Sequence, residues 1–139
     1  FRPYSWFFEH LVACRSLGGN FLPNVGPAGN GEMHPNYYLQ MEGIAAWMKH
    51  SRESVIGASP SPGVERSNVM ITTHDKNWYL HLLPDFKQQV SLKTDKQPKS
   101  VILLRTKADL SYSYRDGFVK FTVPADLRTE MDDVVKVEF

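Results

Sequence analysis

The sequence predicts an α/β fragment followed by an antiparallel β-sandwich. Two helical patterns flank one short apolar run in the first part, and period-two alternation dominates the second. A connector rich in proline, serine and glycine, residues 59–63, separates these two textures. We therefore expect two domains, residues 1–57 and residues 58–139.

The first predicted helix covers residues 5–17. Ser5 is a suitable N-cap, and Phe8 and Leu11 begin an apolar stripe with helical spacing. Gly18-Gly19 ends the helix, because glycine readily adopts the left-handed conformation that closes a helix. This glycine pair precedes a strand, whereas a nucleotide-binding glycine motif follows one, so a phosphate site is not indicated here.

Residues 20–25 form an apolar run of strand length, closed by the turn-forming residues 26–31. A second helix is predicted from Pro35 to about Ser51, since proline suits the first helical position. Its apolar residues recur with helical spacing: Tyr37, Met41, Ile44, Ala45 and Met48. A strand between two helices usually belongs to a parallel sheet. We therefore expect the neighbours of residues 20–25 to be encoded upstream of this sequence.

Seven short strands are predicted after the connector. They are rich in β-branched and aromatic residues and are separated by turn formers such as residues 74–77 and 115–117. This density of short strands is typical of a β-sandwich. The predicted strands are residues 68–73, 78–83, 89–93, 100–104, 110–114, 118–123 and 134–139.

Composition excludes several classes of partner. The 139 residues are 42% hydrophobic and 12% aromatic, which is typical of a globular core. The formal charge is +1, from 16 basic and 15 acidic residues, and the absence of any run of like charges argues against nucleic-acid or membrane-surface binding. Cys14 is the single cysteine, so no disulfide forms within the chain.

Residues 17–27, which read LGGNFLPNVGP, resemble the end of the barrel in glycoside hydrolase family 29, the α-L-fucosidases. The helix through Trp47, the following residues 52–57 and the connector at 59–62 are also similar to that family. Pro23, Asn30 and Arg52 depart from its usual pattern, which bears on subgroup alone.

The resemblance implies a retaining α-L-fucosidase that removes terminal L-fucose from glycans. Residues 1–57 would then be the last helix-strand-helix of a (β/α)₈ barrel, and residues 58–139 the supporting sandwich. Retention needs two carboxyl groups, and the resemblance places both upstream, so this chain is expected to hold no catalytic residue, cofactor or metal and to be inactive alone. The expected partners are the rest of its barrel and fucosylated glycans, in the periplasm, a lysosome or outside the cell.

Asn24 is the one candidate substrate-binding residue, at the end of the expected barrel strand. Its amide would face the sugar or support a neighbouring group, while the alternative is a structural asparagine that bonds the turn. Glu32 is the one acid near that face, and an exposed loop position before the helix is the favoured interpretation.

Other chemically capable residues are interpreted as structural. The five histidines lack the spacing of a metal motif, although His74 and His81 could meet across neighbouring strands. We expect Cys14 and Trp47 to be buried, like most such residues. A sugar-stacking platform of Trp6, Trp78 and Tyr79 is the less favoured alternative to core packing.

Two other functions remain open for the predicted sandwich. An autonomous carbohydrate-binding module would show two or three exposed aromatic residues on one sheet face. A purely structural module would cover the barrel helices and set the geometry between domains. The alternation in the sequence indicates no such aromatic row.

Overall fold

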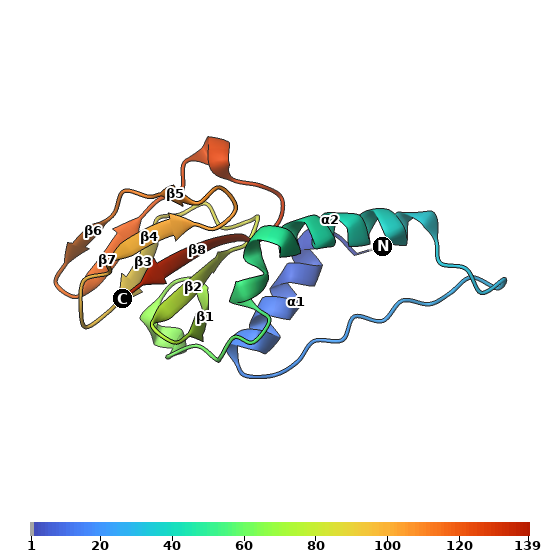
Figure 1. Cartoon of the computed structure of the whole chain (residues 1–139), viewed down its shortest axis with the longest axis horizontal. Coiled ribbons are helices and arrows are strands. Elements are labelled where there is room, and N and C mark those ends of the chain that lie inside the picture. The colour runs from blue at the N-terminus through green and yellow to red at the C-terminus, as the bar shows by residue number, and fades with distance from the viewer. Residues whose placement is uncertain (1) are drawn as a thin grey trace.

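Two α-helices precede eight strands in the computed structural model, which describes residues 2–139. The strands form one five-stranded and one three-stranded antiparallel sheet. Figure 1 shows the sheets at one end of the molecule and the helices at the other. The predicted order, helical segment first and antiparallel sheets second, is confirmed.

Helix α1 (Tyr4–Ser16) begins one residue earlier than predicted, and the prediction of Ser5 as its N-cap is wrong. The N-cap is Pro3, whose carbonyl accepts the first backbone hydrogen bonds, from the N–H groups of Trp6 and Phe7. The helix ends as predicted, since Gly18 has φ +87°. A Cβ there would lie 3.1 Å from Cγ of Pro60, so glycine also allows the connector to pass close by.

Helix α2 (Pro35–Ser51) has the predicted bounds, with proline at its start. The side chain of His34 accepts a hydrogen bond from the Asn36 N–H and caps the helix. A short 3₁₀ turn, η1 (Arg52–Ser54), follows directly. Neither helix within residues 2–139 combines the length and the apolar character that a bilayer-spanning segment requires.

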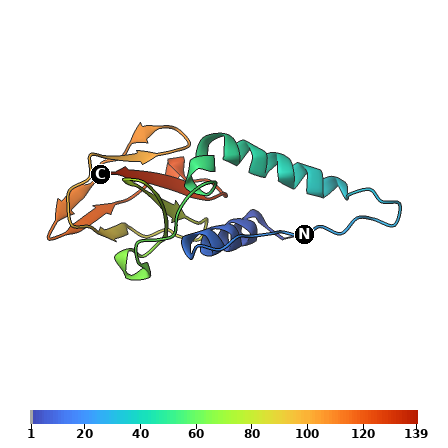
Figure 2. The same cartoon turned by 60° about the horizontal axis from the view of Figure 1, so that its bottom comes forward.

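The strand predicted at residues 20–25 does not form, and this prediction is wrong for the structure as described. Residues 19–28 have no regular secondary structure, and no other part of residues 2–139 pairs with residues 20–25. Residues 17–34, which connect α1 to α2, form a long arm. The arm extends past the N-terminal end of α2 before it returns to that helix (Figure 2). The physical reason is that a strand needs a neighbouring backbone to bond.

The five-stranded sheet is built around the long pairing of β2 with β8, which runs from Asn77 opposite Glu138 to Leu82 opposite Asp133. Its order is β1-β2-β8-β4-β5, and that of the smaller sheet is β3-β7-β6. The strands are β1 (Met70–His74), β2 (Asn77–Leu82), β3 (Val90–Lys93), β4 (Ser100–Leu103), β5 (Ala108–Asp109), β6 (Ser113–Arg115), β7 (Phe118–Phe121) and β8 (Asp133–Glu138).

The single strand predicted at residues 110–114 is wrong. Of this range, only Ser113 and Tyr114 lie in a strand, β6, while residues 110–112 are the connection from β5 in one sheet to β6 in the other. Leu110 is buried and Tyr112 and Tyr114 are partly buried against the same core. Residues that cross between sheets thus keep an apolar pattern without forming one ladder.

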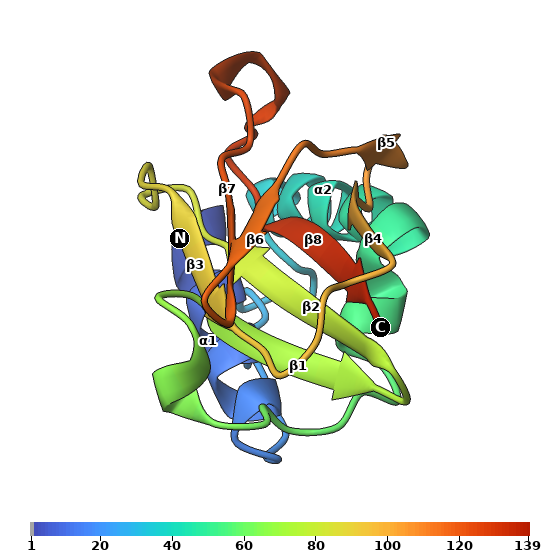
Figure 3. The same cartoon turned by 90° about the vertical axis from the view of Figure 1, so that its left-hand side faces the viewer.

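Two hydrophobic clusters organise the packing. The larger lies between the two sheets and contains the buried residues of β3, β4 and β7 with one face of β1, β2 and β8. The smaller joins α1 and α2 to the opposite face of β2 and β8, through Tyr79 and Val134. Figure 3 shows both helices behind β2 and β8, away from β6 and β7. The five-stranded sheet is therefore covered on both faces.

Candidate functional site

The predicted site residue Asn24 lies in a hollow of about 320 Å³ between the arm and both helices. Trp6 from α1 and Tyr37 and Met41 from α2 line the same hollow. The Asn24 side chain is exposed and forms no hydrogen bond within residues 2–139. Its amide donors and acceptor are therefore available to a polar ligand such as a sugar hydroxyl.

An aromatic group borders this hollow. The Trp6 ring lies 4.3 Å from the His10 ring and 6.0 Å from that of Phe21, measured between centroids. The Arg2 guanidinium carbon is 5.2 Å from the Trp6 centroid, within cation–π range. The arm leaves α1 after Ser16, and Phe21 then packs back onto Trp6 and His10 of that helix.

The platform of Trp6, Trp78 and Tyr79 does not exist. Tyr79 is buried in the cluster that contacts the helices, and it points its hydroxyl at Glu53. Trp78 lies on the other face of β2, against the core between the sheets, because successive strand residues alternate in direction. Trp6 is on α1. The three aromatic residues therefore cannot share one ligand.

Glu32 is an exposed loop residue, as predicted. Its backbone N–H donates to Oδ1 of Asn30 at 3.0 Å, and its carboxylate accepts from Nδ2 of the same residue at 3.2 Å.

A buried polar chain links Thr72, His81 and Asp132. Nδ1 of His81 lies 2.6 Å from Oδ2 of Asp132, and Nε2 lies 2.8 Å from the Thr72 hydroxyl oxygen. Both side chains of the His81–Asp132 pair have no solvent exposure. Asp132 was not predictable from the sequence, because it stands 51 residues from His81 and no local motif marks it.

The direction of these hydrogen bonds argues against catalysis by the buried chain. The Thr72 hydroxyl donates its proton to the Ser54 carbonyl at 2.5 Å, so Nε2 of His81 must be the donor toward Thr72. A nucleophilic hydroxyl would instead donate to the imidazole. All three side chains are also closed to solvent, so no substrate reaches them. The buried chain is therefore a structural link between η1 and the sheet.

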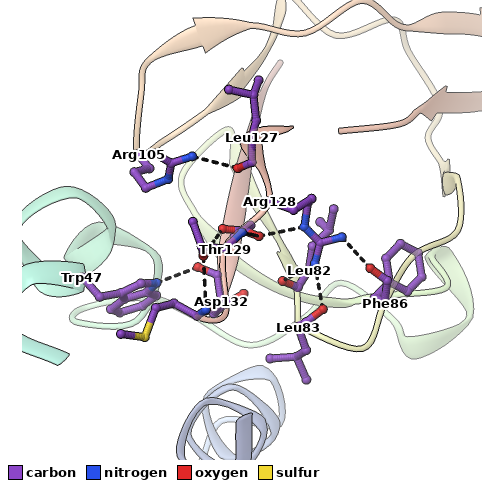
Figure 4. A network of polar contacts seen from close by, with 11 residues as sticks. Trp47, Leu82, Leu83, Phe86, Arg105, Leu127, Arg128, Thr129 and Asp132 are labelled. Carbon is purple, nitrogen blue, oxygen red and sulfur yellow. Dashed lines mark hydrogen bonds and ion pairs between the residues drawn. The ribbon is translucent and has the colours of Figure 1, made fainter. Parts of the chain in front are cut away.

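A second network fastens the start of β8 and is drawn in Figure 4. Arg128 donates from Nε to Oδ2 of Asp133 at 2.7 Å and from Nη2 to the Leu83 carbonyl at 2.8 Å. The Trp47 indole N–H donates to the Asp132 carbonyl at 2.6 Å, which confirms that Trp47 is a core residue of α2. Trp47 thus binds α2 to the start of β8, and Arg128 binds the start of β8 to the end of β2.

Glu53 forms a partly exposed site at the edge of η1. Its Oε2 accepts from the Tyr79 hydroxyl at 2.6 Å and from Nζ of Lys136 at 3.0 Å. Partial burial acts to raise the pKa of Glu53, but the hydrogen bonds from Tyr79 and Lys136 outweigh it and lower that pKa. The pKa of Tyr79 is raised, first by burial and then by the carboxylate. A proton-donating carboxylic acid is thus disfavoured here.

The possible metal pair of His74 and His81 is not assembled. His74 is exposed and lies 3.3 Å from Asp75, while both ring nitrogens of His81 are engaged inside the sheet. No group of three His, Cys, Asp or Glu residues in the described chain is arranged to hold a metal ion.

Cys14 is half-buried, so the prediction that it is buried is wrong.

Comparison with known proteins gives one consistent result. No family model matches the chain. Tissue α-L-fucosidase of Mus musculus is 29% identical over 112 aligned positions, in an alignment that covers 76% of this chain and 25% of that protein. The Bos taurus protein of the same name is 26% identical over 147 aligned residues, covering 96% of this chain and 31% of that protein.

Solved structures match over nearly the whole chain. α-L-Fucosidase isoenzyme 1 from Paenibacillus thiaminolyticus has a TM-score of 0.85 at 21% identity, over 99% of this chain and 35% of that one. An α-fucosidase of Thermotoga maritima has a TM-score of 0.77 at 18% identity, over 100% of this chain and 35% of that one. The chain therefore corresponds to the C-terminal part of such proteins and spans about a third of their length or less.

Proposed function

We propose that this chain is the C-terminal part of a retaining α-L-fucosidase that removes terminal L-fucose from glycans. The sequence matches to mammalian α-L-fucosidases support the activity. Among the structural matches, a Thermotoga maritima enzyme was solved with fucose, and a Bacteroides thetaiotaomicron enzyme as a trapped covalent intermediate. A covalent glycosyl-enzyme is the intermediate that retaining glycosidases form.

Within that enzyme, residues 1–57 form the last helix-strand-helix of the (β/α)₈ barrel. The observation that carries this proposal is the arm between α1 and α2, whose residues 20–25 are apolar yet unpaired. Leu22 is 82% exposed and Leu17 is 74% exposed. Backbone pairing and burial against neighbouring barrel strands would satisfy both the free peptide groups and these side chains.

Residues 58–139 form a β-sandwich that braces the end of the barrel. Arg15, near the end of α1, donates from Nε to the Val55 carbonyl at 3.0 Å and from Nη2 to the Ala58 carbonyl at 2.5 Å. The Ser61 N–H donates to the Ser16 carbonyl at 2.8 Å. These bonds, with the helix-facing hydrophobic cluster, orient the two helices and therefore the arm between them.

Asn24 has the role of a sugar-facing amide in this proposal. A strand at residues 20–25 places Asn24 near its carboxyl end, and barrel enzymes bind substrate at that end. The nucleophile and the acid/base are supplied by the remainder of the barrel. This chain closes the barrel, provides the polar contact of Asn24 with the sugar, and holds the end of the barrel in place through the sandwich.

Reconstitution from two polypeptides tests the proposal. The chain would be co-expressed with the N-terminal two-thirds of the Paenibacillus thiaminolyticus enzyme, and hydrolysis of 4-nitrophenyl α-L-fucoside would be measured. We expect no turnover by the chain alone and turnover by the complex. Asn24→Ala should raise KM about five- to tenfold, the effect of one hydrogen bond of about 1–1.5 kcal/mol.

A matched pair of charge substitutions tests the barrel strand itself. Leu22→Asp should abolish assembly, because a charge would enter the barrel interior or the layer beneath the helices. Val64→Asp is the control, since Val64 is equally exposed, at 77%, but follows the connector. Turnover by the purified chain alone, or normal assembly of Leu22→Asp, would contradict the proposal.

A further inference from the structure

A second hollow lies at the opposite end of the molecule from Asn24. Its volume is about 370 Å³, within the range of small-ligand sites. Its lining residues come from the segment before β1, the β1–β2 turn, the start of β2, the loop after β3 and the last residue of the chain. Figure 1 shows the C-terminus at the end of β8 that lies away from the helices. Its lining combines two aromatic rings with charged side chains: Arg66, Lys76, Trp78, Thr94, Asp95, Lys96 and Phe139.

The aromatic floor is rigid. Trp78 and Phe139 both pack against the core between the sheets, and their ring centroids lie 4.9 Å apart at an interplanar angle of 65°. The Phe139 N–H donates to the Lys76 carbonyl at 3.0 Å, which fixes the turn that carries Lys76. The two rings thus form a corner and not a parallel slot. A corner suits the puckered C–H surface of a sugar better than a planar base.

The charged rim is positive. Three cationic side chains face one carboxylate, that of Asp95. Neither Lys76 nor Lys96 has a hydrogen bond or ion pair from its ammonium group within residues 2–139. The Arg66 guanidinium carbon lies 6.0 Å from the Trp78 centroid. Among the described residues, 2–139, the guanidinium makes one hydrogen bond, a long one of 3.4 Å to the Lys93 carbonyl. Most of its donors remain available to an anion.

We propose that this corner binds an anionic saccharide, with the sugar ring against Trp78 and Phe139 and a sulfate or carboxylate group held by Arg66 and Lys96. Charge complementarity selects the acidic group, and the apolar corner selects the ring. The choice of a saccharide rests on the proposed function, since glycans are the substrate class of that enzyme. The site would hold an acidic part of the glycan away from the barrel.

Binding to the 139-residue chain tests this without any assay of hydrolysis, so its outcome is independent of the fucosidase proposal. The probes are galactose 6-sulfate and glucuronic acid, with galactose as the uncharged control. The readout is the NMR shift of the Trp78 indole N–H, assigned from the spectrum of Trp78→Phe. We expect both acidic sugars to bind at least tenfold more tightly than galactose, because charge-assisted hydrogen bonds contribute more than neutral ones.

Variants identify the groups that bind. Arg66→Gln and Lys96→Gln should each weaken binding of galactose 6-sulfate by about tenfold, the effect of one charged contact. Lys87→Gln is the matched control, an exposed lysine outside the hollow, and should bind normally. Three results would overturn the proposal: equal affinity for galactose, equal affinity for inorganic sulfate, or tighter binding of AMP.

Discussion

The two parts of the molecule satisfy their apolar and backbone groups differently. The sheets bury a closed core between them, in which Leu80, Leu92 and Val135 have no exposure. The helices bury one face against the sheet and leave apolar side chains such as Leu39 largely exposed. The apolar residues between the sheets are therefore covered by this chain itself, whereas the helices leave several apolar side chains in solvent.

The polar groups at the junction show how the two parts are joined. Within the sheet, the Thr72 hydroxyl contacts the His81 ring, which in turn contacts the Asp132 carboxylate. The Asp132 carbonyl accepts a hydrogen bond from Trp47 of α2. The Ser54 carbonyl of η1 accepts one from the Thr72 hydroxyl. These contacts are buried, so each depends strongly on its partner. The helical region is held rigidly on one side although it is open on the other.

Removal of the Asp132 carboxylate is the strongest test of this junction. Asp132→Ala should lower the free energy of unfolding by about 3–5 kcal/mol, because it leaves a buried imidazole without its partner. Asp132→Asn should cost less, since its amide can donate to Nδ1 of a neutral His81. Asp109→Ala, at an exposed strand position, is the control and should change stability by less than about 0.5 kcal/mol. Urea unfolding measures all three, and equal effects of Asp132→Ala and Asp109→Ala would refute a structural role for the pair.

Matched leucine truncations compare the two regions directly. Leu92→Ala should cost about 2–5 kcal/mol, the usual effect of emptying a packed core position. Leu22→Ala should be nearly neutral in the isolated chain, because the side chain is already 82% exposed. The same urea experiment compares them. A large effect of Leu22→Ala would mean that the arm packs on this chain, and would remove the basis for treating it as an unpaired barrel strand.

The smallest expected effect is a pH dependence at Glu53. Since its pKa in the folded chain is lowered from the ordinary value of 4.5, its stabilising contribution is present above that value and is lost as the pH falls through the folded-state pKa. Glu53→Gln should therefore unfold with a weaker pH dependence below about pH 4.5. The difference should be less than about 1 kcal/mol, because the carboxylate is 47% exposed. Identical slopes for both proteins between pH 3 and 7 would contradict the assignment.

Local patterns predicted the regular elements well. The helices were recognisable from apolar spacing and from Pro35 and Gly18, and the predicted strand 118–123 contains β7. The error at residues 110–114 has a clear cause: Leu110, Tyr112 and Tyr114 contact the core in alternation, but alternation reports which side chains face the core and not whether their backbone joins a sheet. The boundary between domains and the role of Asn24 remain proposals.

By itself, the sequence determined the order of elements, the turns and the similarity to α-L-fucosidases, because each depends on neighbouring residues or on a continuous motif. The tertiary structure alone decided which distant groups meet: His81 with Asp132, Glu53 with Tyr79 and Lys136, and Trp78 with Phe139. It also decided that residues 20–25 lack a ladder in this chain, since strand pairing depends on a neighbouring backbone and not on the apolar residues of the strand.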